Sequence, residues 1–406
     1  MNPLKSPESR ISRLVANIEP SATLAVDAKG KALKAQGEPV VSFGAGEPDF
    51  PTPSIIVQAA IEAAKDPKYH KYTPVAGLDE LRAALAEKTS KTTNYKVESS
   101  QVLVTNGGKQ ALYNSCLSLL NPGDEVLLPT PYWSTYPEAI KLASGIPVEV
   151  PTKFENNFHV TAEDLQSKLT KNTKMIILTS PNNPTGAVLK KEELIQIGEF
   201  AVKNNLWIIT DEIYEFLVYD TAQQFSIVSL VPELKDTCLI INGVAKTYAM
   251  TGWRVGWIVG PKDVINAAIN LQSQTTSNVN NIAQMATLGA LRSSDEDFKT
   301  MKSAFEKRRQ LIYSLLTSIE GIDCNLPEGA FYAYPSFKNF IGRSIGSTKI
   351  NNTLDLAELI LDKAKVAFVP GEAFGTPGYG RFSYALSQDD ITEGINRIHK
   401  LLMEVN

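Results

Sequence analysis

Lys246 and Arg254 are two basic residues, eight positions apart, that could bind and react with a ligand. Both lie in the stretch Asn242 to Gly260, which reads NGVAKTYAMTGWRVGWIVG. The lysine comes directly after a predicted strand, where an amine of lowered pKa can form an imine with an aldehyde. The guanidinium, eight residues later, can hold a phosphate through paired hydrogen bonds. A lysine at a strand end is by itself more often an ordinary surface charge.

A buried carboxylate is predicted at Asp211, near the end of the run LWIITDEIY. A buried aspartate needs a cationic partner, and a protonated pyridine nitrogen would serve. Three residues later, Tyr214 could reach a phenolic oxygen on the same ring. The alternative interpretation, an aspartate that caps a helix, is equally consistent with this motif alone.

Two turn-rich segments follow other predicted strands. The segment SPNNPTG holds two asparagines between prolines, the second being Asn183, and ordinary turn chemistry explains it fully. The segment TNGG contains Gly107 and Gly108 and leads into a predicted helix from Lys109 to Leu119. Exposed backbone N–H groups and the helix dipole make such a junction a phosphate site, although the signal is weak by itself.

Two further motifs suggest other enzymes but lack the expected surroundings. Ser344 fits the G-x-S-x-G pattern of serine hydrolases, yet its flanks do not predict a strand before it and a helix after it. His399 lies downstream as the base that a hydrolase would need. Gly44-Ala45-Gly46 begins like a dinucleotide fingerprint, and Pro48 disfavours an immediate helix. A hydrolase at Ser344 therefore stays an outside alternative, and a Rossmann dehydrogenase is disfavoured.

The elements that must position these residues alternate between short apolar strands and helices. This alternation is typical of an α/β protein with a mostly parallel, mixed sheet covered by helices. Ligands of such sheets bind beyond the carboxyl ends of the strands, where Asp211 and Lys246 stand. The predicted strands are Gln101 to Thr105, Glu125 to Leu128, Met175 to Thr179, Leu206 to Thr210, Cys238 to Ile241 and Val255 to Val259.

The length of 406 residues predicts a large domain with a smaller one attached. A long helical pattern opens near Phe298 and gives way to pieces punctuated by glycine and proline, which indicates a small α+β domain. The turn-rich stretch from Ser21 to Phe50 reads as a connecting, lid-like arm. We predict an N-terminal arm at 1–47 that belongs to the small domain, a large cofactor-binding domain at 48–295 and a small C-terminal domain at 296–406.

Composition and charge exclude several classes of function. The net charge of -4 comes from 40 basic and 44 acidic residues dispersed along the chain, so nucleic acid is not an expected partner. No run approaches the ~20 apolar residues of a membrane span, and Met1 to Ala16 lacks the apolar core of a secretory signal, so we expect a cytoplasmic protein. Cys116, Cys238 and Cys324 are widely separated, so we predict that they are buried thiols. The histidines are scattered as well, so no metal site is expected.

Taken together and in this order, the motifs resemble the class I aminotransferases of the fold type I pyridoxal-phosphate enzymes. The resemblance covers nearly the whole chain, and GVAKTYAMTGWRVG fits the lysine signature of that family from end to end. Transcription regulators with this fold carry an N-terminal helix-turn-helix module, for which a resemblance that begins near Ile11 leaves no room. Further segments at the expected positions are AGEPDF, YTPVAG, NGGKQAL, PTPYW, SPNNPTG, TDEIY and GRFSYA.

The resemblance implies pyridoxal 5'-phosphate as cofactor and a homodimer with shared sites. Lys246 would form the Schiff base and move the proton during catalysis, and Asp211 would keep the ring nitrogen protonated. Arg381 would bind the substrate α-carboxylate, helped by Asn183 and the backbone near Gly46. The other implied contacts are Asn183 and Tyr214 at the phenolic oxygen, Trp133 on the ring face beside the substrate, and Gly107, Gly108, Lys109, Arg254 and, from the neighbouring subunit, Tyr72 at the phosphate.

The chain departs from the family pattern at two places. Gly243 stands where a serine that touches the phosphate is common, and segment 272–281 has no arginine for a distal substrate carboxylate. The bacterial and plastid branch, which the chain resembles more closely, binds that carboxylate with a lysine of the phosphate-cup motif and a threonine of the N-terminal arm, and Lys109 and Thr23 match these positions. The resemblance implies transfer of the amino group of L-aspartate to 2-oxoglutarate. Prephenate is an additional or alternative substrate, and an aromatic amino acid or alanine is a further alternative.

Overall fold

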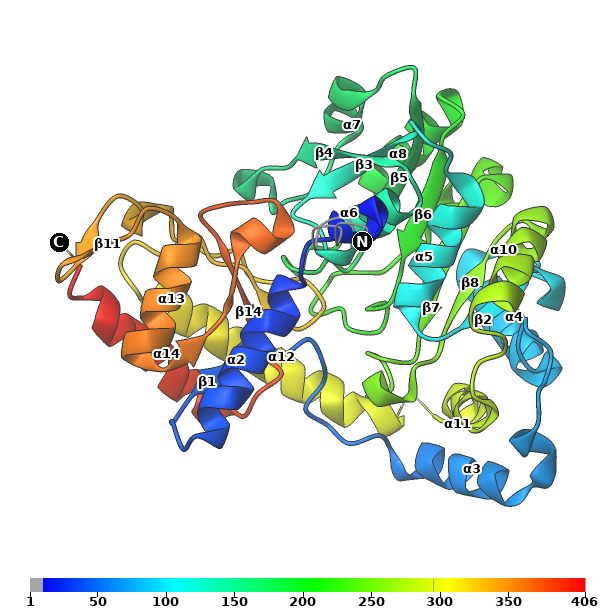
Figure 1. Cartoon of the computed structure of the whole chain (residues 1–406), viewed down its shortest axis with the longest axis horizontal. Coiled ribbons are helices and arrows are strands. Elements are labelled where there is room, and N and C mark those ends of the chain that lie inside the picture. Colours follow the sequence, from blue (N-terminus) through cyan, green and yellow to red (C-terminus); the bar gives the residue numbers. More distant parts are fainter. Residues whose placement is uncertain (1–9, 295, 406) are drawn as a thin grey trace, which may run out of the picture.

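A seven-stranded sheet forms the centre of the larger body of the protein (Figure 1). In the computed structural model, which describes residues 10–294 and 296–405, β8 is antiparallel to both of its neighbours and the other pairs are parallel. The order across the sheet is β2 (Val102–Thr105), β8 (Gly256–Val259), β7 (Cys238–Gly243), β6 (Trp207–Asp211), β5 (Thr173–Thr179), β3 (Glu125–Thr130) and β4 (Ile146–Pro151).

The predicted strands are all present, with ends that shift by at most two residues. The sequence did not predict β4, which lies at one edge of the sheet. Of its six residues only Val150 is buried, and Pro147 and Pro151 interrupt the apolar pattern. An edge strand can hold prolines and polar residues because one side forms no ladder, so it lacks the hydrophobic run that marks a buried strand.

Apolar side chains cover both faces of the sheet. Along β7 the side chains alternate between two hydrophobic cores, with Leu239 and Ile241 in one and Ile240 in the other. Burial on both faces explains why the central strands read as unbroken hydrophobic runs. One core includes α5 (Gly108–Leu119), α6 (Thr135–Leu142) and α10 (Lys262–Thr275), and the other includes α3 (Ser54–Lys65), α4 (Asp79–Thr93), α8 (Lys191–Lys203) and α11 (Asn281–Arg292).

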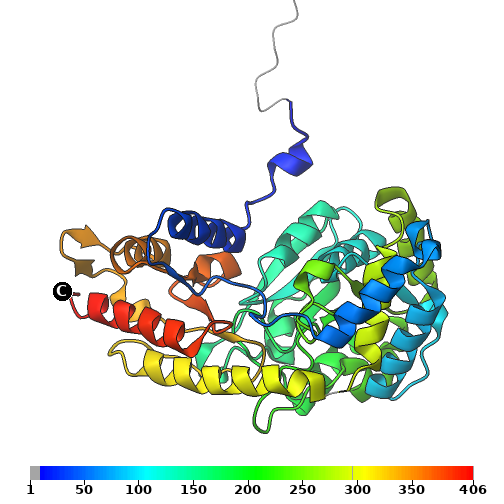
Figure 2. The ribbon, with the colours of Figure 1, turned by 90° about the horizontal axis from the view of Figure 1, so that it is seen from below.

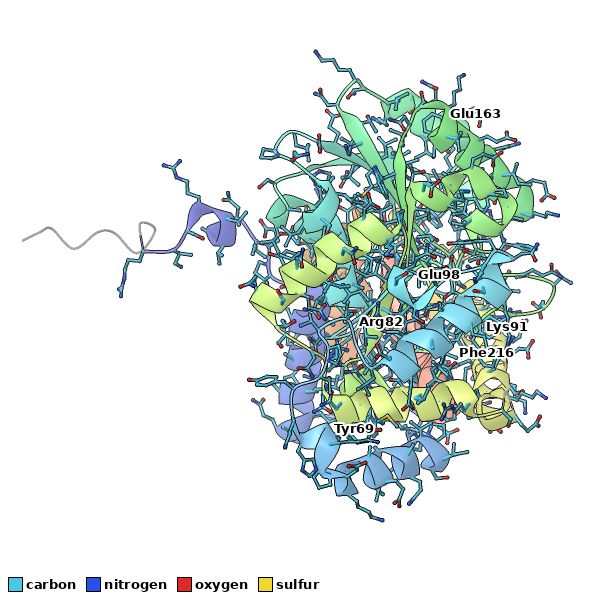
Figure 3. The ribbon with its side chains drawn as sticks, turned by 90° about the vertical axis from the view of Figure 1, so that its right-hand side faces the viewer. Tyr69, Arg82, Lys91, Glu98, Glu163 and Phe216 are labelled. Atoms are coloured by element: carbon cyan, nitrogen blue, oxygen red, sulfur yellow. The ribbon has the colours of Figure 1, made fainter. Side chains whose placement is uncertain are left out.

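Helix α4 ties down the edge strand β2. Nε of Arg82, a residue labelled on α4 in Figure 3, donates a hydrogen bond of 3.0 Å to the carbonyl of Val102. The side-chain amide of Gln101, just before β2, donates one of 3.3 Å to the carbonyl of Gly260, which follows the neighbouring strand β8. The contact from Arg82 satisfies a backbone group that an open edge would leave free to pair with another chain.

The smaller body packs around the long helix α12 (Glu296–Thr317), which Figures 1 and 2 show running along its base toward the sheet. Helices α13 (Thr353–Ala364) and α14 (Gln388–Leu402) share its core with stacked aromatics such as Phe368 and Phe382, whose ring centres are 4.8 Å apart. Its small sheets contain β9 (Tyr332–Ala333), β12 (Val366–Ala367), β13 (Val369–Pro370) and β14 (Gly380–Ser383).

The N-terminal arm joins this smaller body. β1 (Val41–Ser42) pairs in parallel with β12, and α2 (Ala22–Ala35) packs on β1, β12 and β13. Figure 2 shows the segment before α2, with α1 (Arg13–Ala16), extending away from the body. Residues 1–9 lie outside the described residues.

Helix signals in the sequence match the observed ends of α14. Ser387 caps it by accepting a hydrogen bond from the Asp390 amide at 3.0 Å, and two aspartates occupy its first turn. Ile391, Ile395 and Ile398 recur on one face and are buried.

Among residues 10–294 and 296–405, no helix has the length and apolar character needed to cross a membrane. The remaining elements are α7 (Ala162–Lys168), α9 (Ile227–Leu230), β10 (Ser344–Ile345), β11 (Thr348–Lys349) and short 3-10 helices.

Candidate active site

Three neighbouring strands deliver side chains to one edge of the sheet. β5 ends at Thr179, just before the loop that holds Asn183, while β6 ends at Asp211 and β7 ends three residues before Lys246. In the ladder, Asp211 is opposite Thr179 on one side and Ile241 on the other. Because these strands are parallel, their carboxyl ends meet, which brings the predicted residues to one place.

The amino group of Lys246 lies among aromatic rings. It donates a hydrogen bond to the carbonyl of Gly46 and lies 5.7 Å from the centre of the Phe331 ring and 5.9 Å from that of Tyr214. Burial, and next the positive charge of Arg381, lower the pKa of Lys246 to about 8. A lysine with this pKa is partly neutral near pH 7, and a neutral amine is nucleophilic and can accept a proton.

Asp211 is a buried carboxylate whose hydrogen-bond partners in the described chain are both neutral. The hydroxyl of Tyr136 donates to Oδ2 at 2.9 Å, and the amide of Ile213 donates to Oδ1 at 3.2 Å. Burial raises the pKa of Asp211 to about 6, although these hydrogen bonds and the charge of Lys246 act in the opposite direction. Such a carboxylate is well placed to receive a cationic group of a ligand.

Gly107, Gly108 and Arg254 form a cradle for an anion. Gly107 has a φ of 80°, and a Cβ on it would lie 2.6 Å from Nη2 of Arg254. Gly108 opens helix α5, so backbone N–H groups at this helix end point outward. Arg254 also has a positive φ, of 58°, and its Nη1 donates to the carbonyl of Thr251 at 2.9 Å. Helix end, glycine backbone and guanidinium together suit a phosphate.

The glycine at position 243 has a structural reason. A Cβ there would lie 3.0 Å from the carbonyl oxygen of Val255 and 3.1 Å from Cδ1 of Ile213. A serine at this position would therefore crowd the adjacent strand, so Gly243 reflects packing between β7 and the segment that leads into β8.

Lys109 borders an open cleft beside the cradle and contacts the ring of Trp133. The Lys109 amine donates to Oγ1 of Thr135 at 3.0 Å and lies 5.0 Å from the centre of the Trp133 ring. Desolvation, and next the charge of Arg254, lower the pKa of Lys109. The cleft has a volume of ≈ 1120 Å³, and Lys109, Arg254 and the arm residues 18–21 line it. Lys141, Glu19, Glu138 and Glu372 line the cleft as well, so an anionic ligand is favoured only where the charges of Lys109 and Arg254 act on each other.

Arg381 is a buried guanidinium, with 1% of its surface exposed. Nη1 donates to Oδ1 of Asn183 and Nη2 to the carbonyl of Gly44, each at 3.0 Å. Its Nε is buried with no hydrogen-bond partner in the described part of the chain, where no acidic side chain pairs with it either. An uncompensated buried charge is costly, so this arrangement calls for an anionic ligand such as a carboxylate.

Tyr214 lies between Lys246 and Arg381. Its hydroxyl is 2.9 Å from that of Tyr332. Burial holds the pKa of Tyr214 well above its usual value, so the hydroxyl keeps its proton and remains a donor. Asn183 contributes a second donor, because its oxygen already accepts from Arg381 and its amide nitrogen is left for another group.

Two predicted residues lie apart from this cluster within the subunit. Tyr72 is 91% exposed. The residues on either side of it are held by the side chain of Asn281, whose amide donates to the carbonyl of Lys71 at 2.7 Å and whose oxygen accepts from the Thr73 hydroxyl at 2.6 Å. Thr23 is on α2, where its hydroxyl is buried and has no hydrogen-bond partner in the described chain. Tyr72 is thus open to solvent within its own subunit.

Comparisons with known proteins agree over nearly the whole chain. Residues 38–398 match the family Aminotransferase class I and II. The chain belongs to this family. It is 57% identical to an aspartate aminotransferase of Streptomyces avermitilis over 98% of this chain and 97% of that protein. It is 45% identical to a probable aspartate/prephenate aminotransferase of Aquifex aeolicus over 96% of this chain and 98% of that one.

Solved aminotransferase structures have the same fold. The aspartate aminotransferase of Rhizobium meliloti superimposes with a TM-score of 0.94 at 36% identity, covering 98% of this chain and 99% of that one. The Thermus thermophilus enzyme with maleate gives 0.91 at 39% identity, covering 97% and 99%. The predicted family and the predicted fold, a mostly parallel sheet with a smaller α+β part, are therefore confirmed.

Sequence reasoning missed two tyrosines of this aminotransferase. Tyr136 donates to Asp211, and Tyr332 contacts both Tyr214 and Arg381. Tyr136 follows Trp133 by three residues at the start of a helix, a spacing that could have suggested a shared face. Tyr332 lies in GAFYAYP, where aromatic residues indicate a core and nothing marks one of them as functional.

Ser344 does not have the surroundings of a hydrolase nucleophile. It lies in β10, which forms a two-stranded antiparallel hairpin with β11 through Gly346, whose φ is 57°. A nucleophile elbow requires a turn from strand to helix, and a hairpin cannot present the serine in that way. The outside alternative of a serine hydrolase was therefore wrong in its structural premise, because glycines at this spacing also suit a hairpin turn.

The remaining thiols belong to the core. Cys116, Cys238 and Cys324 are free and buried, as predicted. Burial raises the pKa of Cys116 and of Cys324 to about 12 and that of Cys238 well above its usual value, so the thiols are inert. Within the described residues no three His, Cys, Asp or Glu side chains gather in a way that could hold a metal ion.

Proposed function

We propose that this aminotransferase moves the amino group of L-aspartate to 2-oxoglutarate, giving oxaloacetate and L-glutamate, with pyridoxal 5'-phosphate as its cofactor. The observation that carries the proposal is the position of the Lys246 amine near the Tyr214 ring. Nε of Arg381 is buried without a hydrogen-bond partner in the described chain and can therefore bind a carboxylate. The names of the relatives support the choice of aspartate, because some are aspartate aminotransferases and others are aspartate/prephenate aminotransferases.

The residues present fit this cofactor. Pyridoxal phosphate supplies the aldehyde that takes up an amino group and the ring that accepts an electron pair. Gly107, Gly108 and Arg254 would hold its phosphate, together with Lys109, whose charge lies at the same cleft. Asp211 would hold the proton on the ring nitrogen, and a positive partner there would relieve its burial. Asn183 and Tyr214 would donate to the phenolic oxygen, and Trp133 would cover the ring and border the substrate.

Each side chain then has a defined task during turnover. Arg381 binds the α-carboxylate of the amino acid, with Asn183 and Gly44 holding the guanidinium in place. The carbonyl of Gly46, which accepts from Lys246, borders the same space. The neutral amine of Lys246 takes the proton from the substrate α-carbon and returns it on the path to the 2-oxo acid. The steps run in reverse when 2-oxoglutarate takes the place of oxaloacetate.

A second carboxylate on the substrate would meet Lys109 and Thr23. Lys109 provides a charge, and Thr23 provides a buried hydroxyl on the arm with no partner in the described chain. Aspartate and glutamate both carry a second carboxylate, and so does prephenate. Prephenate is the second candidate, because a relative 45% identical is named a probable aspartate/prephenate aminotransferase. Alanine or an aromatic amino acid would leave Lys109 without an anionic partner.

The exposed residues favour a homodimer in which Tyr72 reaches the phosphate of the other subunit. Besides Tyr72, large apolar side chains are exposed on α3 and α1, namely Ile55, Ile61, Leu14 and Val15.

Free thiols suit a reducing compartment, which supports a cytoplasmic location. We further propose the division into an arm at 1–47, a large domain at 48–295 and a small domain at 296–406, since α12 begins at Glu296 and β1 joins the smaller body.

Absorbance tests the proposal directly. We expect the purified protein, incubated with pyridoxal phosphate and freed of excess, to have a visible absorption band that changes with pH. The Lys246→Ala variant should lose the band, while a surface variant such as Lys203→Ala should keep it. Aspartate and glutamate should each discharge the band faster than alanine or phenylalanine, and adding 2-oxoglutarate or prephenate should restore it to the extent that each is an acceptor. A wild-type protein that stays colourless would contradict the proposal.

A further inference from the structure

Tyr332 is fixed beside Arg381 by backbone pairing. In the small domain, β9 runs antiparallel to β14, with Tyr332 opposite Ser383 and Ala333 opposite Phe382. Tyr332 is completely buried. Two strands that share a ladder move together, so the tyrosine keeps its position relative to the arginine.

The ring of Tyr332 covers one face of the Arg381 guanidinium. The guanidinium carbon lies 4.6 Å from the ring centre. The outer edge of the guanidinium donates to Asn183 and Gly44, and Nε remains for a ligand. Stacking on the face restrains the plane of the guanidinium without using any of its donors. The Phe374 ring lies farther from the guanidinium carbon, at 5.2 Å, so the direction in which Arg381 presents its N–H groups depends more closely on Tyr332.

The hydroxyl of Tyr332 reaches the other part of the site. It lies 2.9 Å from the hydroxyl of Tyr214, and the two rings meet edge to face at 83°. A Cβ on Gly46 would lie 3.9 Å from the same hydroxyl, so it stands next to the backbone that accepts from Lys246. One side chain therefore contacts both the tyrosine beside the lysine and the arginine for the substrate.

We propose that Tyr332 is a positioning residue that couples the two ends of the site: its hydroxyl orients Tyr214 and its ring holds the Arg381 guanidinium. The inference rests on the proposed function, in which Tyr214 donates to the phenolic oxygen of the cofactor. A tyrosine hydroxyl has one proton. When Tyr214 uses its proton for that oxygen, Tyr332 must be the donor in the bond between the two hydroxyls.

The direction of this hydrogen bond has a consequence for the site. A hydroxyl that accepts one hydrogen bond becomes a stronger donor of the next, so Tyr332 strengthens the bond from Tyr214 to the phenolic oxygen. That bond draws negative charge from the oxygen, which otherwise favours a proton on the nearby nitrogen of Lys246. Without the Tyr332 hydroxyl, the loaded protein should hold that proton to higher pH.

The Tyr332→Phe variant isolates the hydroxyl from the ring. In the loaded protein, the pH midpoint of the visible absorption change should move upward by about 0.1–0.7 pH unit, since one hydrogen-bonded neighbour strengthens the next bond by roughly 10–30%. The KM for aspartate should change by less than about twofold, because the ring over Arg381 is retained. Tyr332→Leu removes the ring as well and should raise the KM by up to about 30-fold.

Tyr334→Phe is the matched control. Tyr334 is also buried and directly follows β9, but its hydroxyl bonds to Thr376 at 2.6 Å and its ring stacks on Tyr379. Removal of the Tyr334 hydroxyl should leave the pH midpoint of the visible absorption change where it is in wild type. An unshifted midpoint in Tyr332→Phe, or an equal shift in Tyr334→Phe, would overturn the inference while the proposed function stands. A wild-type protein without the absorption band would overturn the proposed function and this inference with it.

Discussion

The hydroxyl of Tyr136, near the start of helix α6, donates a hydrogen bond of 2.9 Å to Oδ2 of Asp211 at the end of strand β6. The same hydroxyl is 2.5 Å from Oγ1 of Thr179, which is its second hydrogen-bond partner. Burial raises the pKa of Asp211 and this hydrogen bond lowers it, so Tyr136 helps to keep the carboxylate ionised. An ionised Asp211 is what the proposed ring nitrogen requires.

Tyr136→Phe should therefore weaken cofactor binding at mildly acidic pH. Without its donor, the pKa of Asp211 should rise further above about 6, by about 1–2 pH units for a hydrogen bond to a charged group. The pH below which the apoprotein loses affinity for pyridoxal phosphate should move upward by the same amount, which fluorescence titration between about pH 5 and 9 would measure. Tyr132→Phe is the control, because its hydroxyl bonds to Glu149 at 2.7 Å instead. Superimposable profiles for Tyr136→Phe and wild type would refute this role.

Lys109→Ala should raise the KM for dicarboxylic substrates more than that for alanine or phenylalanine. Loss of a charge-assisted contact costs ~1.5–3 kcal/mol, or about 10 to 100-fold in KM. Steady-state kinetics with aspartate, glutamate, alanine and phenylalanine would measure the difference. Lys141→Ala removes another charge from the same cleft, one that is paired with Glu138 at 2.8 Å, and should affect all four substrates equally little. Equal losses on every substrate in Lys109→Ala would assign Lys109 to the phosphate alone and contradict its contact with the second carboxylate.

Arg381→Lys should impair every amino donor to a similar extent. The change keeps the charge but removes the planar fork that binds a carboxylate and the donors held by Asn183 and Gly44. Loss of paired contacts to the α-carboxylate should raise the KM by about 100-fold, whatever the substrate side chain. The ratio of kcat/KM for aspartate over alanine should stay near its wild-type value. A selective loss of aspartate activity would mean that Arg381 binds the distal carboxylate.

Gly107→Ala should weaken cofactor binding. The new Cβ would lie 2.6 Å from Nη2 of Arg254, so the guanidinium must move, and a φ of 80° adds roughly 1–2 kcal/mol of backbone strain. The dissociation constant for pyridoxal phosphate should rise by about 10 to 100-fold. Gly123→Ala is the matched control, because that glycine has a φ of 92° and no atom within 4 Å of the added Cβ. Equal effects of both substitutions on cofactor affinity would point to strain alone.

His159 should make the stability of the apoprotein depend on pH. It is buried between two carboxylates, with Nδ1 2.8 Å from Glu193 on α8 and Nε2 3.1 Å from Glu328 in the segment before β9. Burial alone lowers the pKa of His159, but the two carboxylates more than reverse this and raise it to about 9. A raised pKa means that the folded protein gains stability from the bound proton.

The sign of this effect follows from the unfolded value of about 6.5. The stabilisation is complete below about pH 6.5 and is lost as the pH rises through 9, by up to about 3 kcal/mol. The pKa of Glu193 and that of Glu328 are lowered by the same contacts, so their contribution fades below about pH 4.5. Urea unfolding at fixed protein concentration should give a decline between pH 6.5 and 9 in wild type and a flatter profile in His159→Gln. Parallel profiles would contradict the assignment.

The strands, the reactive residues at their ends and the family could be predicted from the amino-acid sequence. Buried parallel strands must be apolar along their whole length, so β5, β6 and β7 stood out, and the residues that follow each of them had to meet at one sheet edge. Local patterns in the sequence can be recognised without knowledge of the fold, and these include a lysine, a buried aspartate and an arginine with a glycine cradle. Edge strand β4 lacked this signal because burial on one side imposes no hydrophobic run.

The side chains that support these groups became clear only from the fold. Tyr136 and Tyr332 are far in sequence from Asp211 and Arg381, and nothing in their local pattern distinguishes them from core aromatics. The lowered pKa of Lys246 likewise depends on burial and on Arg381, which is more than a hundred residues away. Hydrogen bonds, stacking and desolvation are properties of neighbours in space, so a sequence can name the reacting groups but cannot fix their surroundings.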